Sequence, residues 1–232
     1  MTEKNNPASV QSVDEAIAGR HSVRRFLPKE LSKETVASLL ELGAMAPSGT
    51  NVQPWKVYAL TGEAKNALSM AILKKFDAGE KESREYDYYP KVWEEPWLSR
   101  RRGVGVKLYG LLGISKGDTE GMKRQTARNF LFFDAPVGLI FTMDRRFGNG
   151  MFMDIGMFME NVMIAARARG LDTCTQAFFA DYPDAIRTCL GISQNEIIVC
   201  GMALGYADQS APENTLKAGR EAVENFAVFR GF

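Results

Sequence analysis

Histidine and cysteine are scarce in this chain of 232 residues, and neither sign of charge dominates it. His21 is the single histidine, which excludes a metal site built from several histidines. Cys174, Cys189 and Cys200 lie far apart without a C-x-x-C pair, which is typical of reduced thiols in a cytoplasmic protein. Lys and Arg number 29 against 28 Asp and Glu, and this balance gives no long-range field that would hold a nucleic acid.

Long apolar runs and the common catalytic motifs are also missing. No window of about 18 or more apolar residues is present, so no membrane span is expected. Residues 1–11 form a polar leader without the apolar run of a signal peptide, and we expect a cytoplasmic location. Gly103-Val104-Gly105 does not continue into a dinucleotide fingerprint, and neither a P-loop nor a G-x-S-x-G elbow is found. Hydrolytic chemistry through a side-chain nucleophile is therefore not expected.

Periodicity and capping residues predict a mixture of helices and strands. Ser12 and Glu15 form a capping box that begins one helix, and Ser32 begins a second helix that ends before Pro47. Strands are expected at 56–60, 137–142, 173–178 and 197–204, and further helices at 63–76, 151–169 and 183–190. Because the strands and helices do not alternate regularly, the pattern favours an α+β fold over a doubly wound one.

Two stretches depart from this pattern. Residues 77–125 carry dense charges and clustered aromatics, and we interpret them as a variable insertion of short helices and loops within one domain spanning 1–232. The helix at 151–169 is apolar nearly all round, so it is expected to be buried in the core or against another subunit. The polar tail at 208–232 ends in Phe226, Val228, Phe229 and Phe232, and so many apolar side chains indicate that it docks on another surface.

Two loops carry side chains suited to binding. In the turn Arg20-His21-Ser22-Val23-Arg24, two guanidiniums flank a hydroxyl, an arrangement that suits a phosphate monoester and also occurs in ordinary solvated turns. The loop Pro47-Ser48-Gly49-Thr50-Asn51-Val52-Gln53-Pro54-Trp55 offers neutral donors and acceptors for the edge of a heterocycle. The same side chains could instead satisfy one another in a tight connection.

Together the two loops resemble the flavin-dependent nitroreductase family. The pattern Arg-His-Ser-x-Arg-x-Phe matches residues 20–26, and Pro-Ser-x-x-Asn-x-Gln-Pro-Trp matches residues 47–55. The helix end and strand start at 168–172, the strand at 201–206 and Arg220 before the aromatic tail match as well. The resemblance thus covers nearly the whole chain outside the insertion.

The resemblance implies an α+β sheet flanked by helices in an intertwined homodimer that binds FMN between its subunits, with the tail docked on the partner. Arg20, Ser22 and Arg220 would lie near the FMN phosphate, His21 in the same turn, and Arg24 near the pyrimidine end of the ring. The partner subunit would contribute Pro47, Ser48, Gly49 and Asn51. Backbone amides of Ala177 and Phe178 would reach the flavin ring where many relatives have Glu-Gly, and Arg128 is a weak further match.

The activity that the resemblance implies is that of an oxidoreductase. NADH or NADPH would deliver electron pairs to FMN, and a nitroaromatic compound or quinone would then receive them in a ping-pong cycle without a catalytic side chain. Reductive dehalogenation, enone reduction and flavin fragmentation on the same scaffold remain open, as does a flavin-binding protein without turnover. The run Arg100–Arg102 is either a solvated face of a lid or a selector for an acidic aromatic compound or the NADPH phosphate.

Overall fold

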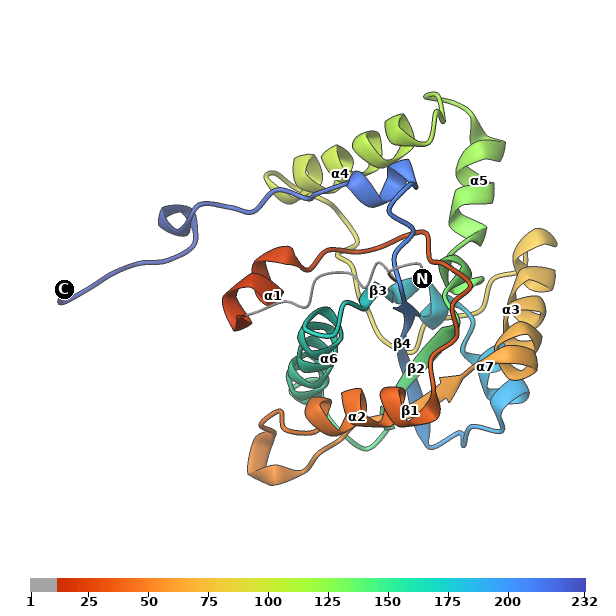
Figure 1. Ribbon diagram of the computed structural model, residues 1–232, viewed down its shortest axis with the longest axis horizontal. Coiled ribbons are helices and arrows are strands. Elements are labelled where there is room, and N and C mark those ends of the chain that lie inside the picture. Colours follow the sequence, from red (N-terminus) through yellow and green to blue (C-terminus); the bar gives the residue numbers. More distant parts are fainter. Residues whose placement is uncertain (1–11) are drawn as a thin grey trace, which may run out of the picture.

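A four-stranded antiparallel sheet in the order β1-β2-β4-β3 forms the centre of the fold (Figure 1). This computed structural model describes residues 12–232, so the expected polar leader at 1–11 lies outside the described residues. Both central strands are buried almost throughout, which explains their continuous apolar sequences. The strands are β1 (Lys56–Leu60), β2 (Val137–Asp144), β3 (Asp172–Gln176) and β4 (Glu196–Gly205).

Helices cover both faces of the sheet, and each face has its own apolar core. The longer helices are α1 (Val13–Gly19), α2 (Lys33–Gly43), α3 (Gly62–Asp77), α4 (Trp97–Leu111), α5 (Thr119–Ala127), α6 (Met151–Arg167) and α7 (Pro183–Leu190). Helices α2 and α6 pack on one face, and α3 and α7 pack on the other (Figure 1). The expected α+β fold with flanking helices is confirmed.

Short 3₁₀ turns join these elements, and some expected boundaries move. The 3₁₀ turns are η1 (Gly49–Asn51), η2 (Phe132–Asp134), η3 (Ala177–Asp181), η4 (Pro212–Thr215) and η5 (Val223–Asn225). The strand expected at 173–178 ends at Gln176, because the chain turns into η3. The helix expected to reach Pro47 ends at Gly43, where a Cβ would lie 2.6 Å from Val162 Cγ2 and would block the close approach of α2 to α6.

Local sequence signals explain several of the helix boundaries. The capping box at α1 is confirmed, since Ser12 Oγ accepts from Glu15 N at 3.2 Å and Glu15 Oε2 accepts from Ser12 N at 3.0 Å. In the insertion, α4 has 15 residues and is longer than the short helices expected there. It lies along the edge of the molecule beside η4, and none of its residues is buried (Figure 1).

The C-terminal tail leaves the body of this protomer and extends away from it (Figure 1). Its apolar side chains are exposed, with Phe226 at 71%, Val228 at 81% and Phe229 at 64%. Helix α6 also exposes an apolar edge, where Met153 is 70% exposed, so this helix is not buried all round within the protomer. Docking of the tail on a partner stays a prediction.

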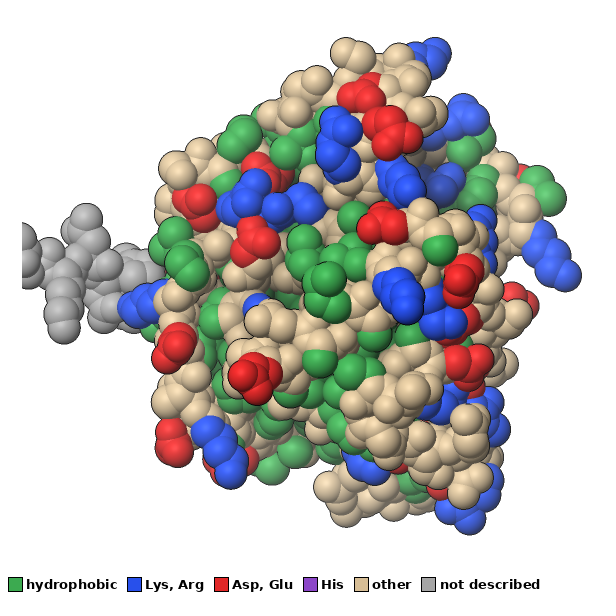
Figure 2. Space-filling view, turned by 90° about the vertical axis from the view of Figure 1, so that its right-hand side faces the viewer, with side chains coloured by type: hydrophobic (Ala, Val, Ile, Leu, Met, Phe, Trp, Pro, Cys, Tyr) green, Lys and Arg blue, Asp and Glu red, His purple; other side chains and the backbone are tan. Residues whose placement is uncertain are grey.

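The face seen in Figure 2, on the side of α3, α5 and α7, carries Lys and Arg side chains interspersed with Asp and Glu. Apolar side chains lie scattered between the two kinds of charge. Within residues 12–232, no helix combines the length and the apolar character needed to cross a bilayer.

Candidate functional site

The arginine turn (residues 20–25) lies along the outer edge of β3. Val23 N donates to the Thr173 carbonyl at 3.1 Å, so the turn is hydrogen-bonded to the edge strand. From the other side, Asn214 Oδ1 accepts from Arg24 N at 2.7 Å. Two backbone segments far apart in the sequence therefore hold the turn. The role of Asn214 carried no signal in the sequence, where it is one polar residue in a polar tail.

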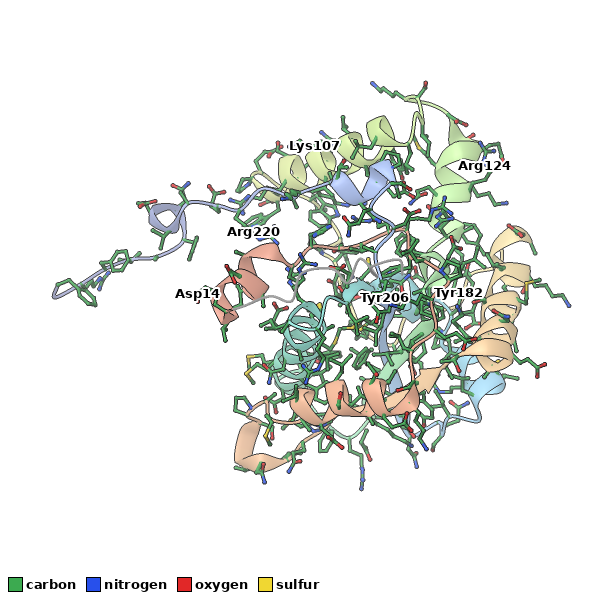
Figure 3. The ribbon with its side chains drawn as sticks, viewed as in Figure 1. Asp14, Lys107, Arg124, Tyr182, Tyr206 and Arg220 are labelled. Atoms are coloured by element: carbon green, nitrogen blue, oxygen red, sulfur yellow. The ribbon has the colours of Figure 1, made fainter. Side chains whose placement is uncertain are left out.

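A cavity of 370 Å³ opens beside this turn and is strongly cationic. The end of α1, Val104 of α4 and the tail at 216–220 form its other walls. Figure 3 shows Arg220 between α1 and α4. Among the described residues that line the cavity there is no carboxylate, whereas the positively charged or basic ones are Arg20, His21, Arg24, Lys217 and Arg220. Such a set of donors suits an anion with several oxygen atoms, such as a phosphate.

Arg20 and His21, which line the cationic cavity, contact neighbouring segments of the chain. Arg20 Nε lies 3.3 Å from Glu160 Oε1 on α6, yet this buried N–H forms no hydrogen bond. The His21 ring lies between two backbone carbonyls, 3.3 Å from that of Gly19 and 3.1 Å from that of Asn214. The Arg20 side chain is 21% exposed, so a bound anion in the cavity would offer its guanidinium an acceptor besides Glu160.

A second, larger cavity of 1020 Å³ adjoins the first, and Arg24 lines both. The end of β3, the start of η3, β4, α6 and the segment 85–89 form its walls. Many of the lining side chains are aromatic or apolar, including Tyr86, Tyr88, Phe152, Ile155, Met159 and Phe178. A cationic cavity thus continues into a wide cavity suited to a flat ring system.

Glu85 anchors the segment that forms one wall of the large cavity. Its carboxylate accepts from Arg187 Nη2 at 2.6 Å and from Ile198 N at 2.9 Å, and it also binds Arg145. Burial raises the pKa of Glu85, but the hydrogen bonds from Arg145 and Arg187 outweigh this effect, and the net pKa lies below its usual value. Glu85 is therefore an ionised structural residue.

Tyr86 brings the next part of this segment into the cavity wall. Its hydroxyl donates to the Val199 carbonyl of β4, and its ring centroid lies 4.7 Å from that of Phe152 on α6. Burial raises the pKa of the Tyr86 hydroxyl, which therefore stays protonated at neutral pH. Tyr88 and Tyr89 follow at the mouth and are 53% and 50% exposed.

Two buried thiols and one unpaired acceptor complete the cavity. Burial raises the pKa of Cys174, and it raises that of Cys200 to about 12, so neither thiol ionises at neutral pH. Gln176 Nε2 donates to the Asn129 carbonyl at 2.6 Å, whereas the buried Gln176 Oε1 has no partner. The cavity therefore offers no thiolate nucleophile, but it does offer a free acceptor to a ligand N–H.

The structure brings most of the expected site residues together. Arg20, His21, Ser22, Arg24 and Arg220 line the cationic cavity, and Ala177 and Phe178 line the large one. Lys217 joins them, beside Ala218, where relatives commonly have a basic residue, and it can supply the same charge. Arg128 lines neither cavity; its Nη2 lies 3.4 Å from the Arg24 carbonyl and 3.0 Å from Asp134 Oδ2, so it supports the arginine turn from behind.

The loop with Pro47, Ser48, Gly49 and Asn51 also lines neither cavity of its own protomer. It projects beyond α2, on the opposite side of the molecule from α4 (Figure 1). Thr50, Asn51 and Gln53 have φ angles of 48°, 60° and 52°, which is an unusual, strained run for residues other than glycine. The buried Asp154 holds the loop by accepting from Gly49 N at 3.2 Å.

The two adjoining cavities have the charge and the lining that suit a phosphate-bearing ring compound, and comparison with known proteins gives the family. The model of the nitroreductase family matches residues 17–206, and the chain belongs to this family. It is 41% identical to a 4-nitrobenzoate reductase of Nocardioides sp. (strain LMS-CY), over 95% of this chain and 91% of that protein. It is 40% identical to a nitrobenzene nitroreductase of Ectopseudomonas oleovorans, over 94% and 96%. The FMN and NADPH-dependent nitroreductase NfnB of Sphigopyxis sp. strain HMH superposes with a TM-score of 0.92 at 36% identity, covering 95% of this chain and all of that one.

Replacement of Glu85 by Gln tests the anchoring of the cavity wall. The variant removes the carboxylate that Arg145 and Arg187 share and leaves Arg187 only its longer ion pair with Asp184, and we expect a loss of about 3 kcal/mol in the free energy of unfolding at pH 7. Because the folded-state pKa of Glu85 lies below the unfolded value of about 4.3, this stabilisation is complete above about pH 5 and is lost as the pH falls through the folded pKa. Urea unfolding from pH 7 to pH 3 measures both effects.

The matched control is Glu80→Gln, which removes an exposed carboxylate of the same segment. It should change the free energy of unfolding by less than about 1 kcal/mol. An E85Q protein as stable as the unsubstituted one at pH 7 would show that Glu85 does not anchor the segment.

Proposed function

We propose that the protein is an FMN-dependent oxidoreductase that uses NADPH to reduce nitroaromatic compounds. The observation that carries this proposal is the cationic cavity that shares Arg24 with a larger, aromatic-lined cavity. FMN has the matching shape, with a phosphate at one end and a flat tricyclic ring at the other. The relatives named as nitroarene reductases, and the FMN and NADPH-dependent structural neighbour, support the same activity.

The residues present fit FMN. Arg20, Ser22, Lys217 and Arg220 would hold the phosphate, since all four line the cationic cavity. Arg24 would lie at the pyrimidine end of the ring, and the unpaired Gln176 Oε1 would accept from a ring N–H. The chemistry that bound FMN supplies is two-electron transfer from NADPH to the nitro group.

The chain itself binds and orients the reactants. Arg24 presents a fixed positive charge, since its Nη1 donates to the Ser22 carbonyl at 3.1 Å and its backbone is held by Asn214. A cation at this place stabilises negative charge on a reduced ring and favours reduction. Aromatic walls from Tyr86, Phe152 and Phe178 exclude water and provide flat contacts for an aromatic acceptor.

The working unit in this proposal is a homodimer. A groove of 400 Å³ between α1 and α6 would receive the exposed tail of a second copy. Its lining is mainly apolar, with Val13, Ala16, Leu42, Ile164, Ala165 and Ala168, and it also includes Ser12, Asn161 and Arg169. Burying the tail phenylalanines there removes from water side chains that the single protomer leaves exposed. The same pairing gives the projecting loop at 47–53 a cavity in the partner subunit to contact.

A reducing, cytoplasmic setting suits this activity. Cys174, Cys189 and Cys200 are all free thiols, and two of them are buried in the structure. NADPH as the electron donor belongs to the same compartment.

Anaerobic oxidation of NADPH tests the activity. Purified holoenzyme should oxidise NADPH at least about tenfold faster with nitrobenzene present, because the acceptor removes the electron pair that FMN carries. Absorbance at the NADPH band, together with product analysis, measures this rate. An FMN-bound protein whose NADPH oxidation does not respond to any nitroarene or quinone would be a carrier, and the proposal would be wrong.

Replacing Arg20 by Ala tests the cationic cavity. Loss of a charge-assisted contact with the phosphate should weaken FMN binding about 10- to 100-fold. Flavin fluorescence titration of the apoprotein measures the dissociation constant. The control Arg146→Ala removes a guanidinium that is 88% exposed and lines neither cavity, and it should bind FMN as before. Equal affinity in both variants would remove Arg20 from the phosphate site.

The double substitution Phe226→Asp and Phe229→Asp tests the docked tail. Two carboxylates in the apolar groove of the partner should weaken the dimer by at least about tenfold, because each charge loses hydration there. Sedimentation over a concentration series measures the change. Met70→Asp on α3, where Met70 is 64% exposed, is the control and should sediment like the original protein. A fully dimeric double variant would show that the tail phenylalanines do not hold the subunits together.

A further inference from the structure

Few charged side chains line the large cavity, and only some of them are paired with an opposite charge. Among the described residues of its lining, Arg24 is the one cation, and Glu85 and Asp87 are the carboxylates. Glu85 is neutralised by Arg145 and Arg187. Two lining charges are therefore left for a ligand to meet, one positive and one negative.

Asp87 carries the negative charge at the mouth of the cavity. It is exposed between Tyr86 and Tyr88, and its carboxylate has no hydrogen bond or ion pair among residues 12–232. Arg84, in the same segment, does not compensate it: this guanidinium is bound to Asp181 and lies 6.0 Å from the ring centroid of Tyr88. The charge of Asp87 thus acts on whatever enters.

The positive charge of Arg24 would be paired with bound FMN, and the inference therefore rests on the proposed function. Arg24 lines both the large cavity and the cationic cavity and would face the ring of FMN, so it is not free to pair with a second anion. The walls that remain for the acceptor have no uncompensated charge apart from Asp87, and they include Tyr86, Phe152 and Phe178. A carboxylate on the acceptor would find no cation on these walls and would pass Asp87 on entry.

We propose that the acceptor of this site is an uncharged nitroarene, and that Asp87 is the specificity-determining residue that disfavours nitroaromatic carboxylates. Overall identity does not decide between these substrates, since the relatives named for 4-nitrobenzoate and for nitrobenzene are 41% and 40% identical to this chain. The charge of Asp87 at the mouth of the cavity decides between the charged and the uncharged substrate. Like charges several ångströms apart at a wet protein surface repel enough to change relative rates by about three- to tenfold.

The experiment compares 4-nitrobenzamide with 4-nitrobenzoate, which are nearly the same size and differ in charge. The kcat/KM of FMN-loaded enzyme is measured for both acceptors at low ionic strength in the original protein, in D87N and in D87K. The original protein should prefer 4-nitrobenzamide by about three- to tenfold, D87N should lose most of this preference, and D87K should reverse it. Added salt should shrink the difference, because it screens exposed charges.

Two controls separate this effect from others. Glu94→Gln removes an exposed carboxylate of the same insertion that does not line the cavity, and it should leave the ratio unchanged. Calorimetric binding of benzamide and benzoate to the holoenzyme gives a readout without turnover, and the preference for benzamide over benzoate should change with residue 87 as the kcat/KM ratio does.

A ratio that is the same in the original protein, D87N and D87K would overturn the assignment of Asp87. A preference of the original protein for 4-nitrobenzoate would overturn the substrate class. Either result leaves nitroarene reduction intact, whereas a failure to reduce both acceptors contradicts the proposed function itself.

Discussion

The hydrogen-bonded contact between the arginine turn and the outer edge of β3 determines where the site can form. An edge strand has unpaired backbone groups, and here Thr173 uses its carbonyl to bind Val23 N rather than another strand. This contact holds the turn along β3, so that Arg20 lines the cationic cavity and Arg24 lines both cavities. Asn214 closes the arrangement from the tail side. Without this edge pairing, the cationic and aromatic cavities would not meet.

The two cavities differ in charge, and each therefore suits a different part of a ligand. The small cavity is lined by several cationic side chains that suit an anion, and the buried Nε–H of Arg20 there has no hydrogen bond. The large one is neutral over most of its surface, and its buried thiols remain protonated. A protein built this way contributes binding, orientation and a fixed field, and it leaves electron transfer to a cofactor. Glu85 and Tyr86 serve the same end, because they hold an irregular segment in place as a wall.

Much of the fold could be predicted from local signals, and the site only in part. The capping box at Ser12, the apolar runs of β2 and β4 and the α+β arrangement follow from short-range chemistry that the sequence displays directly. The side chains of the arginine turn themselves indicate a phosphate site, whereas residues 177–178 follow only from the family resemblance. Asn214 and Glu85 were not predicted, because each acts across a long stretch of chain and neither belongs to a local motif. The need for glycine at position 43 depends on the close approach of α2 to α6, which periodicity does not reveal. The tail is expected to dock on another surface, and its apolar side chains are exposed in the single protomer.

The central claim is that a cationic cavity beside β3 holds the phosphate of a flavin nucleotide. Parallel titration of the apoprotein with FMN and with riboflavin, which lacks only the phosphate, tests it most directly. The account predicts that FMN binds at least about 100-fold more tightly, because several charge-assisted hydrogen bonds depend on that group. Equal affinities for the two flavins, or no binding of either, would contradict it.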